Sequence, residues 1–231
     1  MIDNAAGSTD QLKVVYSFFG PPGTGKGTVA REAVRTLGFS MVSTGEMLRA
    51  EVASGSDLGL FIQQTVSRGG LVSDDIVAKI VFNALSNSVG SVFILDGYPR
   101  NESQAEDFLN EFSKKFPSVV FKVVYFSLSS DEIRRRLSAR LICQNKRCQQ
   151  TYSQLIHHLR REGFCDACDS ALMRRSDDAG DIVLERLGEY EKHANGVLDV
   201  YLRRGVEICE LDLFGKSESA VFSQFVSQCG I

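Results

Sequence analysis

The sequence lacks the features typical of membrane and secreted proteins. A membrane-spanning helix needs roughly 20 mostly apolar residues, whereas the longest apolar runs here are short segments such as Val119–Phe121 and Val123–Phe126. The first residues, MIDNAAGSTDQLK, contain neither the basic segment nor the apolar segment of a secretory signal. We therefore expect a cytoplasmic protein in a reducing compartment, with no membrane partner.

A large excess of one charge is also missing. The chain carries 26 Lys and Arg against 29 Asp and Glu, for a net charge of −3, which gives no reason to expect bulk binding of nucleic acid. It contains no Trp, no internal repeat and no linker rich in Pro, Gly and Ser. With 43% hydrophobic and 24% charged residues over 231 positions, the composition is that of a folded globular chain, with room for one domain and an insertion.

Short β-branched and aromatic runs alternate with helical stretches along the chain. Near-continuous apolar runs at 91–95 and 119–126 are typical of strands covered on both faces of a parallel sheet. The run at 206–211 alternates with acidic residues and is expected at an edge. Helical stretches are expected at 25–37, 45–53, 57–68, 74–86, 103–115, 130–140, 181–203 and 218–228. This alternation predicts an α/β fold with a doubly wound parallel sheet of about five strands.

One segment interrupts this alternation. Residues 141–173 are polar, contain four of the six Cys and show no long helix. We expect them to form an inserted subdomain. The predicted organisation is a tail at 1–12, a core at 13–140, the insertion at 141–173 and the rest of the core at 174–231.

A glycine-rich segment, Gly20–Thr28, follows the predicted strand at 13–19 and precedes the first predicted helix. Glycines let several backbone N–H groups face an anion, and the helix N-terminus adds its dipole. Lys26 is placed to reach the β- and γ-phosphates of a nucleotide. The general phosphate-loop pattern has Ser or Thr directly after the lysine, whereas here Gly27 follows and Thr28 comes one position later.

This segment reads GPPGTGKGT and resembles the phosphate loop of the adenylate kinases, where Gly-Thr after the lysine is usual. Three further motifs resemble the same family in the same order: STGEMLR at 43–49, DGYPR at 96–100, and RSDD at 175–178 followed by Arg186-Leu187. The resemblance runs from about Lys13 to the C-terminus. It implies a monomer that catalyses Mg²⁺-dependent transfer between nucleotides, ATP + AMP ⇌ 2 ADP. It also implies an acceptor region at about 43–72 and a long lid.

The resemblance further implies roles for individual side chains. Convergent arginines neutralise phosphate charge without acting as nucleophiles. The implied catalytic residues are Lys26, Arg100, Arg136, Arg140, Arg175 and Arg186. The implied ATP site is Gly23, Thr24, Gly25, Lys26, Gly27, Thr28, Arg136, Arg140 and Tyr152. The implied AMP site is Thr44, Arg49, Gly70, Val72, Gly97, Arg100, Gln104, Arg175 and Arg186. Because Arg136 and Arg140 are four residues apart, the sequence predicts that they share one helix face.

Asp96 ends an apolar strand, where a carboxylate is costly unless it has a partner or faces a ligand. Ligands of doubly wound folds bind at the carboxyl ends of strands, so Asp96 is expected to hold the nucleotide's Mg²⁺ through water. A helix N-cap is the alternative.

Acceptor choice depends on a few side chains. Thr44 and Gln104 match the adenine-selecting positions of the family, and a side-chain amide can pair with adenine. Glu46 replaces the usual Asp, and Asn101 is more typical of pyrimidine monophosphate kinases. Another monophosphate as acceptor, or GTP as donor, therefore stays open.

Four cysteines form two close pairs, Cys143-x₄-Cys148 and Cys165-x₂-Cys168, separated by sixteen residues. Such pairs can hold one tetrahedral Zn²⁺, and four protein ligands leave no open position, so the metal would be structural. The segment resembles the zinc-bearing lid of bacterial-type adenylate kinases. Free thiols or disulfides are the alternative, and His157 or His158 could replace a cysteine. Cys209 and Cys229 have no partner motif. A zinc ribbon that binds nucleic acid is the competing function, although Tyr152 and Phe164 are the lid's only aromatic residues.

Overall fold

The computed structural model describes residues 12–67, 72–88, 90–145, 148, 150–155, 159–175, 178 and 180–231. Its centre is a five-stranded sheet in the order β2-β3-β1-β4-β8, in which all four neighbouring pairs are parallel. The strands are β1 (Val14–Phe19), β2 (Ser40–Ser43), β3 (Val92–Asp96), β4 (Val120–Ser127) and β8 (Glu207–Asp212). The predicted parallel sheet is confirmed, and β8 lies at an edge as expected.

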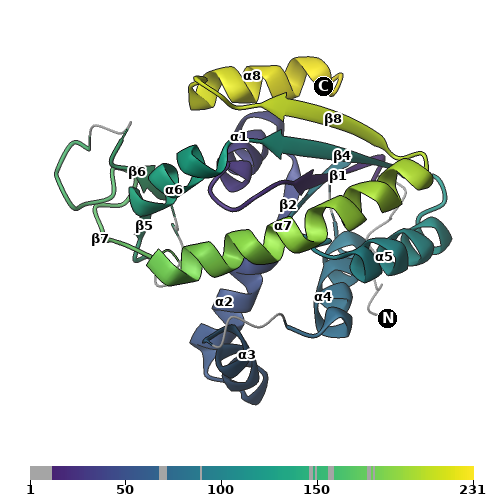
Figure 1. Ribbon diagram of the computed structural model, residues 1–231, viewed down its shortest axis with the longest axis horizontal. Coiled ribbons are helices and arrows are strands. Elements are labelled where there is room, and N and C mark those ends of the chain that lie inside the picture. Colours follow the sequence, from purple (N-terminus) through teal and green to yellow (C-terminus); the bar gives the residue numbers. More distant parts are fainter. Residues whose placement is uncertain are drawn as a thin grey trace, which may run out of the picture.

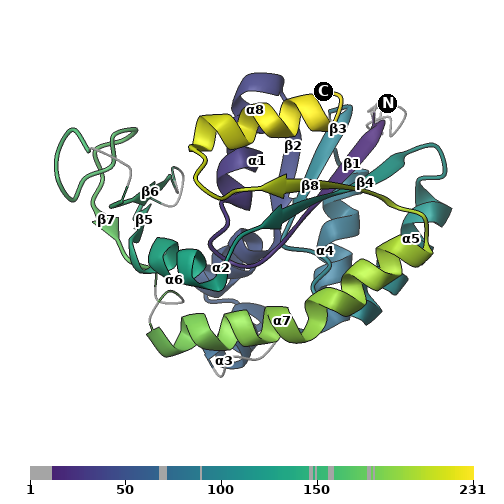
Figure 2. The same cartoon turned by 45° about the horizontal axis from the view of Figure 1, so that its top comes forward.

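Helices cover both faces of this sheet (Figure 1 and Figure 2). Successive side chains of a strand point to opposite faces. In β1, accordingly, Val15 and Phe19 pack into one buried cluster and Tyr16 and Phe18 into the other. The first cluster includes side chains of α4 (Asp74–Ser86), α5 (Glu102–Lys115) and α7 (Gly180–Arg203); the second includes those of α1 (Lys26–Leu37) and α8 (Glu218–Gln228). The fold is therefore doubly wound.

Two smaller units lie at the periphery of this core (Figure 1). One is the helix pair α2 (Thr44–Ser54) and α3 (Asp57–Ser67), which follows β2. The other is a three-stranded antiparallel sheet in the order β6-β5-β7, which follows α6 (Ser130–Ser138). Its strands are β5 (Arg140–Cys143), β6 (Thr151–Ser153) and β7 (Leu172–Met173). We call residues 141–173 the lid.

The helix predicted at 130–140 is two residues too long. Helix α6 stops at Ser138 with Ala139 as its cap, and Arg140 already belongs to β5. Arg140 pairs with Ser153 of β6, and Cys143 pairs with Leu172 of β7. The prediction that Arg136 and Arg140 share a helix face is therefore wrong, because strand pairing with distant residues overrides the local helical pattern.

Strand β2 has no counterpart among the four predicted runs. It has only four residues, SMVS, and two of them are serines, so its composition is not that of a buried strand. Its partner is β3, paired from Ser40–Phe93 to Ser43–Asp96. The sheet thus creates this strand by pairing rather than by local preference.

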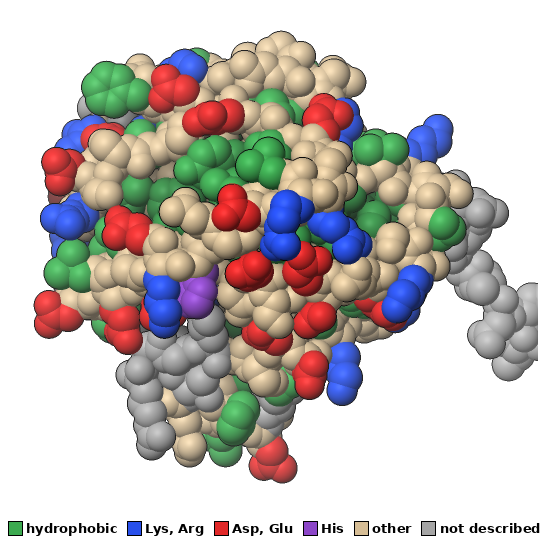
Figure 3. All heavy atoms as spheres, turned by 45° about the vertical axis from the view of Figure 1, so that its right-hand side comes forward, with side chains coloured by type: hydrophobic (Ala, Val, Ile, Leu, Met, Phe, Trp, Pro, Cys, Tyr) green, Lys and Arg blue, Asp and Glu red, His purple; other side chains and the backbone are tan. Residues whose placement is uncertain are grey.

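The described surface matches the even charge balance. On the face in Figure 3, acidic and basic side chains are interspersed. Within the described part of the chain, we find no helix whose length and apolarity would let it cross a bilayer.

Candidate active site

A cleft of about 1600 Å³ opens at the carboxyl ends of the central strands, where ligands of such folds bind. The phosphate loop, α2, the turn after β3, α6, β6 and α7 all contribute to its lining. Most predicted nucleotide residues face it: Gly23, Thr24, Gly25, Lys26, Gly27, Thr28, Arg49, Val72, Asp96, Gly97, Arg100, Arg136, Arg140, Tyr152, Arg175 and Arg186. Gly70 lies outside the described residues.

The phosphate loop connects β1 to α1 and is shaped by glycine. Gly20 has a φ of 143°, and a Cβ there would lie 2.5 Å from the carbonyl oxygen of Phe126. No other residue fits this position without moving β4. The Lys26 ammonium donates to the carbonyl oxygens of Gly20 (2.8 Å) and Pro21 (2.7 Å). The lysine is thereby held inside the loop at the beginning of α1, where the helix dipole also favours an anion.

The electrostatics of the loop favour an anionic ligand. Burial lowers the pKa of Lys26 to about 8; nearby Asp96 opposes this shift, while Arg100, Arg186 and Arg140 add to it. Bound phosphate oxygens would reverse the shift, because a nearby opposite charge favours the ammonium form. The charged form of Lys26 is therefore more strongly favoured when the loop holds phosphate than when it is empty.

Asp178 draws together arginines from two elements. Its side chain is 2% exposed and accepts from Arg186 at 3.1 Å and from the Arg140 Nε at 2.6 Å, with a second bond from the Arg140 Nη2. Arg140 begins the first lid strand, whereas Arg186 belongs to α7. A buried carboxylate with two guanidinium partners is a stable anchor, and it fixes both cations at the rim of the cleft.

Asp96 lies at the end of β3, close to the phosphate loop. A Cβ on Gly27 would be 3.3 Å from its Oδ2, so the absence of a side chain at 27 leaves this carboxylate room. Helix α5 is capped instead by Asn101, whose side chain accepts from the backbone N–H of Gln104. The N-cap alternative for Asp96 is thus ruled out, and its carboxylate faces the cleft.

A second, small cavity of about 20 Å³ adjoins the cleft and shares Leu48, Val72, Gly97 and Arg100 with its lining. It is lined by Thr44, Leu48, Val72, Val77, Gly97, Tyr98, Arg100 and Gln104. Thr44 and Gln104 are only 2% and 3% exposed. Thr44 donates to the carbonyl oxygen of Gly97 at 2.9 Å, and Arg100 donates to the same oxygen through Nε at 2.7 Å. The predicted adenine-selecting residues are therefore brought together.

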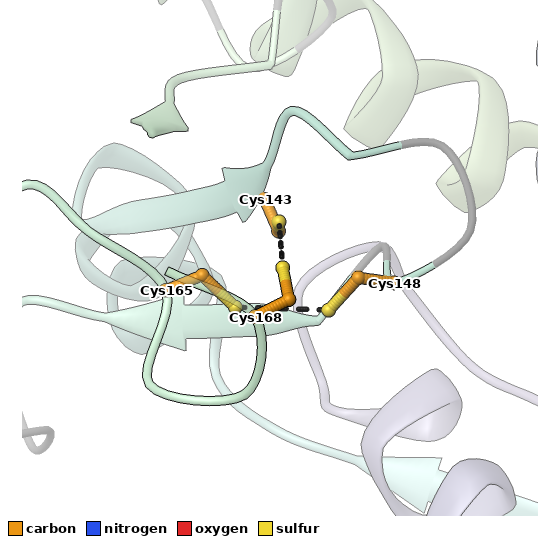
Figure 4. Close-up of side chains that lie close together, drawn as sticks. All are labelled: Cys143, Cys148, Cys165 and Cys168. Carbon is orange, nitrogen blue, oxygen red and sulfur yellow. Dashed lines mark hydrogen bonds between the residues drawn. The ribbon is translucent and has the colours of Figure 1, made fainter. Parts of the chain in front are cut away.

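The four lid cysteines converge (Figure 4). Their sulfur atoms all lie within 4.8 Å of one another, with Cys143–Cys168 at 3.4 Å and Cys148–Cys165 at 3.6 Å. Four sulfurs about 2.3 Å from a tetrahedral zinc would be about 3.8 Å apart. The residues therefore fit one zinc ion. Cys209 and Cys229 lie elsewhere, in the cluster beneath α8.

Several cleft residues were not anticipated from the sequence. Arg31 of α1 contacts Glu46 of α2 (3.0 Å) and the Thr151 hydroxyl of β6 (3.1 Å), so the unusual Glu46 has a partner. Arg31 is one helical turn beyond Gly27 and lies on the same face of α1. From this spacing, the sequence could have predicted that Arg31 faces the cleft. Residues 214–219, which form the loop after β8 and the start of α8, also line the cleft. Their position after the last strand is a general indication of a ligand site.

The chain is similar in sequence to known proteins over most of its length. A family model described as adenylate kinase matches residues 18–206. An adenylate kinase of Trichlorobacter lovleyi is 40% identical over 198 residues, which cover 85% of this chain and 91% of that protein. An adenylate kinase of Pelobacter propionicus is 40% identical over 189 residues (81% and 84%), and one of Treponema denticola is 34% identical over 207 residues (89% and 95%). The chain therefore belongs to the adenylate kinase family.

Proposed function

We propose that this protein catalyses the reversible transfer of a phosphoryl group from Mg²⁺-bound ATP to AMP, giving two ADP. One observation carries the proposal: a single cleft joins the phosphate loop to an arginine-lined acceptor end. Phosphoryl transfer needs positioning and charge neutralisation more than covalent chemistry. The attacking oxygen of AMP is already anionic, so the reaction needs no strong general base.

The donor nucleotide would lie along the phosphate loop and α6. The N–H groups of Gly23–Thr28 and the Lys26 ammonium would hold its phosphates. Arg136, Tyr152 and residues 214–219 also line the cleft, and these groups would surround the rest of the nucleotide. Arg140 would contact the phosphates from the base of the lid.

The acceptor nucleotide would lie at the other end. Arg49 and Arg100 would hold its phosphate, and Thr44, Val72 and Gln104 would contact its adenine. Arg175 and Arg186 also line the cleft and would neutralise the charge that develops where the phosphate chains meet. We include Gly70 and Gly97 in the acceptor site on the family resemblance.

Two metal ions enter the proposal. Mg²⁺ accompanies the nucleotide of a kinase and would neutralise the phosphate oxygens; Asp96 is the residue placed to hold it, through water. Zn²⁺ would be held by Cys143, Cys148, Cys165 and Cys168 as a structural ion. With the metal in place the lid could move as one body, bring Arg140 onto the phosphates and exclude water.

We further propose that the core comprises 13–140 and 174–231, with the lid between them, and that the protein works as a cytoplasmic monomer without a nucleic-acid or membrane partner. The near-even charge balance, 26 Lys and Arg against 29 Asp and Glu, supports the absence of a nucleic-acid partner.

The experiment is a panel of initial rates of ADP formation with ATP or GTP as donor and AMP, UMP, CMP or GMP as acceptor. ATP with AMP should be the fastest pair. Thr44→Ala should lower the rate with AMP more than the rates with the other acceptors. A faster rate with a pyrimidine monophosphate would contradict the proposed acceptor.

A further inference from the structure

The side chain of Gln104 is fixed on two sides by groups of opposite hydrogen-bonding character. Its Oε1 accepts from the backbone N–H of Arg100 at 2.7 Å, and its Nε2 donates to Oδ1 of Asp74 at 2.6 Å. The side chain is almost fully buried and lines the small acceptor cavity. Water therefore cannot easily replace either partner.

These two partners allow one orientation of the amide. The oxygen and nitrogen of a glutamine amide are nearly equal in size, so a flipped amide would occupy the same space. A backbone N–H can only donate, and an ionised carboxylate can only accept. A flipped Gln104 would set two donors against each other at Arg100 and two acceptors against each other at Asp74. The observed orientation leaves one N–H and one oxygen lone pair of the amide for a ligand.

Asp74 is itself held in place. It is the first residue of α4, where the helix dipole favours a carboxylate. Its other oxygen, Oδ2, accepts from Nδ2 of Asn101 at 3.3 Å, while Oδ1 of Asn101 accepts from the backbone N–H of Gln104 at 2.8 Å. The residue that departs from the family pattern at position 101 is thus part of a closed ring of hydrogen bonds.

We propose that Asp74 is a positioning residue for purine selection in the acceptor site. It acts through Gln104: the fixed amide presents its oxygen to the 6-amino group of adenine and its N–H to a ring nitrogen. Hypoxanthine carries a 6-oxo group in place of the amine, so its oxygen would face the oxygen of the amide. The orientation set by Asp74 therefore favours AMP over IMP. This inference rests on the proposed contact between Gln104 and the acceptor base.

The most informative variant is Asp74→Asn, which keeps the size of the side chain. If the new asparagine turns its NH₂ toward Gln104, its oxygen can accept from Asn101, but Gln104 must then flip and lose its bond from the Arg100 N–H. If it turns its oxygen toward Gln104, Gln104 keeps its orientation, but the NH₂ groups of the asparagine and of Asn101 then face each other. Either arrangement contains one unfavourable contact, so the bias between the two glutamine orientations disappears. Asp75→Asn is the matched control, because Asp75 is an exposed carboxylate in the same helical turn.

The measurement is the ratio of kcat/KM for AMP to kcat/KM for IMP, with ATP at saturation. A hydrogen bond to a charged group is worth enough to change this ratio about tenfold or more. We expect Asp74→Asn to lower the ratio by at least about tenfold, Asp75→Asn to leave it unchanged, and the KM for ATP to change little in both. Combining Asp74→Asn with Gln104→Ala should give the ratio of Gln104→Ala alone.

A purely structural role for Asp74 would lower both rates together and leave the ratio intact, which would overturn the inference. If Gln104→Ala abolishes the preference for AMP while Asp74→Asn does not change it, the inference fails and the proposed role of Gln104 stands. If Gln104→Ala leaves the preference unchanged, the proposed role of Gln104 and the inference both fail.

Discussion

The lid and the central sheet are held together in different ways. Two large clusters of apolar side chains pack against the two faces of the sheet. Among the lid's described residues, those buried together are Cys143, Tyr152 and Cys165, with a few partly buried neighbours. A segment of this size cannot bury enough apolar surface to fold alone, so four sulfur ligands around one metal would replace the missing core. The comparison predicts that the two regions can be disrupted separately.

The largest effect on activity is expected from a substitution in the phosphate loop, which belongs to the core. Lys26→Met removes the ammonium proposed to hold the phosphates and should lower kcat by about 10³-fold, measured as ADP formation. Because methionine is similar to lysine in length and fills much of the same space, the midpoint of thermal unfolding and the zinc content should stay near those of the unchanged protein. A variant that keeps most of its activity would contradict the assigned role.

How far the sequence predicts such residues depends on how close they are along the chain. The phosphate loop is a contiguous motif, and its glycines and lysine are recognisable without a structure. By contrast, the contacts of Arg31 with Glu46 and Thr151, and those of Asp178 with Arg140 and Arg186, join segments that are far apart. Strands β2 and β5 were missed for the same reason: each is stabilised by pairing with a distant strand rather than by its own composition.

Within the core, truncating a buried aromatic side chain should destabilise the sheet without disturbing the metal site. Phe225 is fully buried and contacts the rings of Tyr16 and Phe18. Phe225→Ala should lower the free energy of unfolding by about 3–5 kcal/mol, measured by denaturant titration, while the folded protein keeps its zinc. Leu202→Ala is the control, because Leu202 is 66% exposed and its loss should change stability by less than about 0.5 kcal/mol. Equal losses in both variants would contradict the assignment of the core.

In the lid, replacing two ligands should have the opposite pattern. Cys143→Ser with Cys168→Ser should abolish zinc binding, increase hydrogen exchange across 141–173 and leave exchange in the central strands unchanged. Activity should fall about 100-fold, because misplaced groups cost this much even when they are distant from the reacting atoms. Cys209→Ser, outside the lid, is the matched control and should keep both zinc and activity. Loss of protection in the central strands would show that the two regions do not separate.

The pH dependence of activity tests the phosphate loop alone. In the free protein the pKa of Lys26 is about 8, so its charge is lost as the pH rises through this value. The kcat/KM for ATP should then fall by about tenfold for each further pH unit, whereas kcat should fall only at higher pH because bound phosphates favour the ammonium form. Lys26→Arg, which keeps its charge, should not show the decline.

Unfolding does not explain that decline, because the stability contribution of Lys26 has the opposite sign. Its folded pKa lies below the ordinary value of 10.5. Between these two pH values the unfolded chain binds more protons, so the contribution of Lys26 to the free energy of unfolding rises with pH. Thermal unfolding measured across this range separates the two effects.

The smallest effect is expected where the two regions meet. Arg31 contacts α2 through Glu46 and the lid through Thr151, but Arg31 and Glu46 are partly exposed and water screens their attraction. Arg31→Met should lower kcat by about threefold. Glu46→Gln alone should cause part of the same loss, and the double variant should resemble Arg31→Met. Fully additive effects of the two substitutions would show that the pair does not act together.

The most direct test of the account follows all nucleotides after zinc-loaded protein is mixed with equal amounts of ATP, AMP and excess Mg²⁺. The account predicts that two ADP form for each ATP consumed, that AMP disappears at the same rate as ATP, and that no inorganic phosphate is released. One ADP and one inorganic phosphate for each ATP, with AMP unchanged, would contradict it.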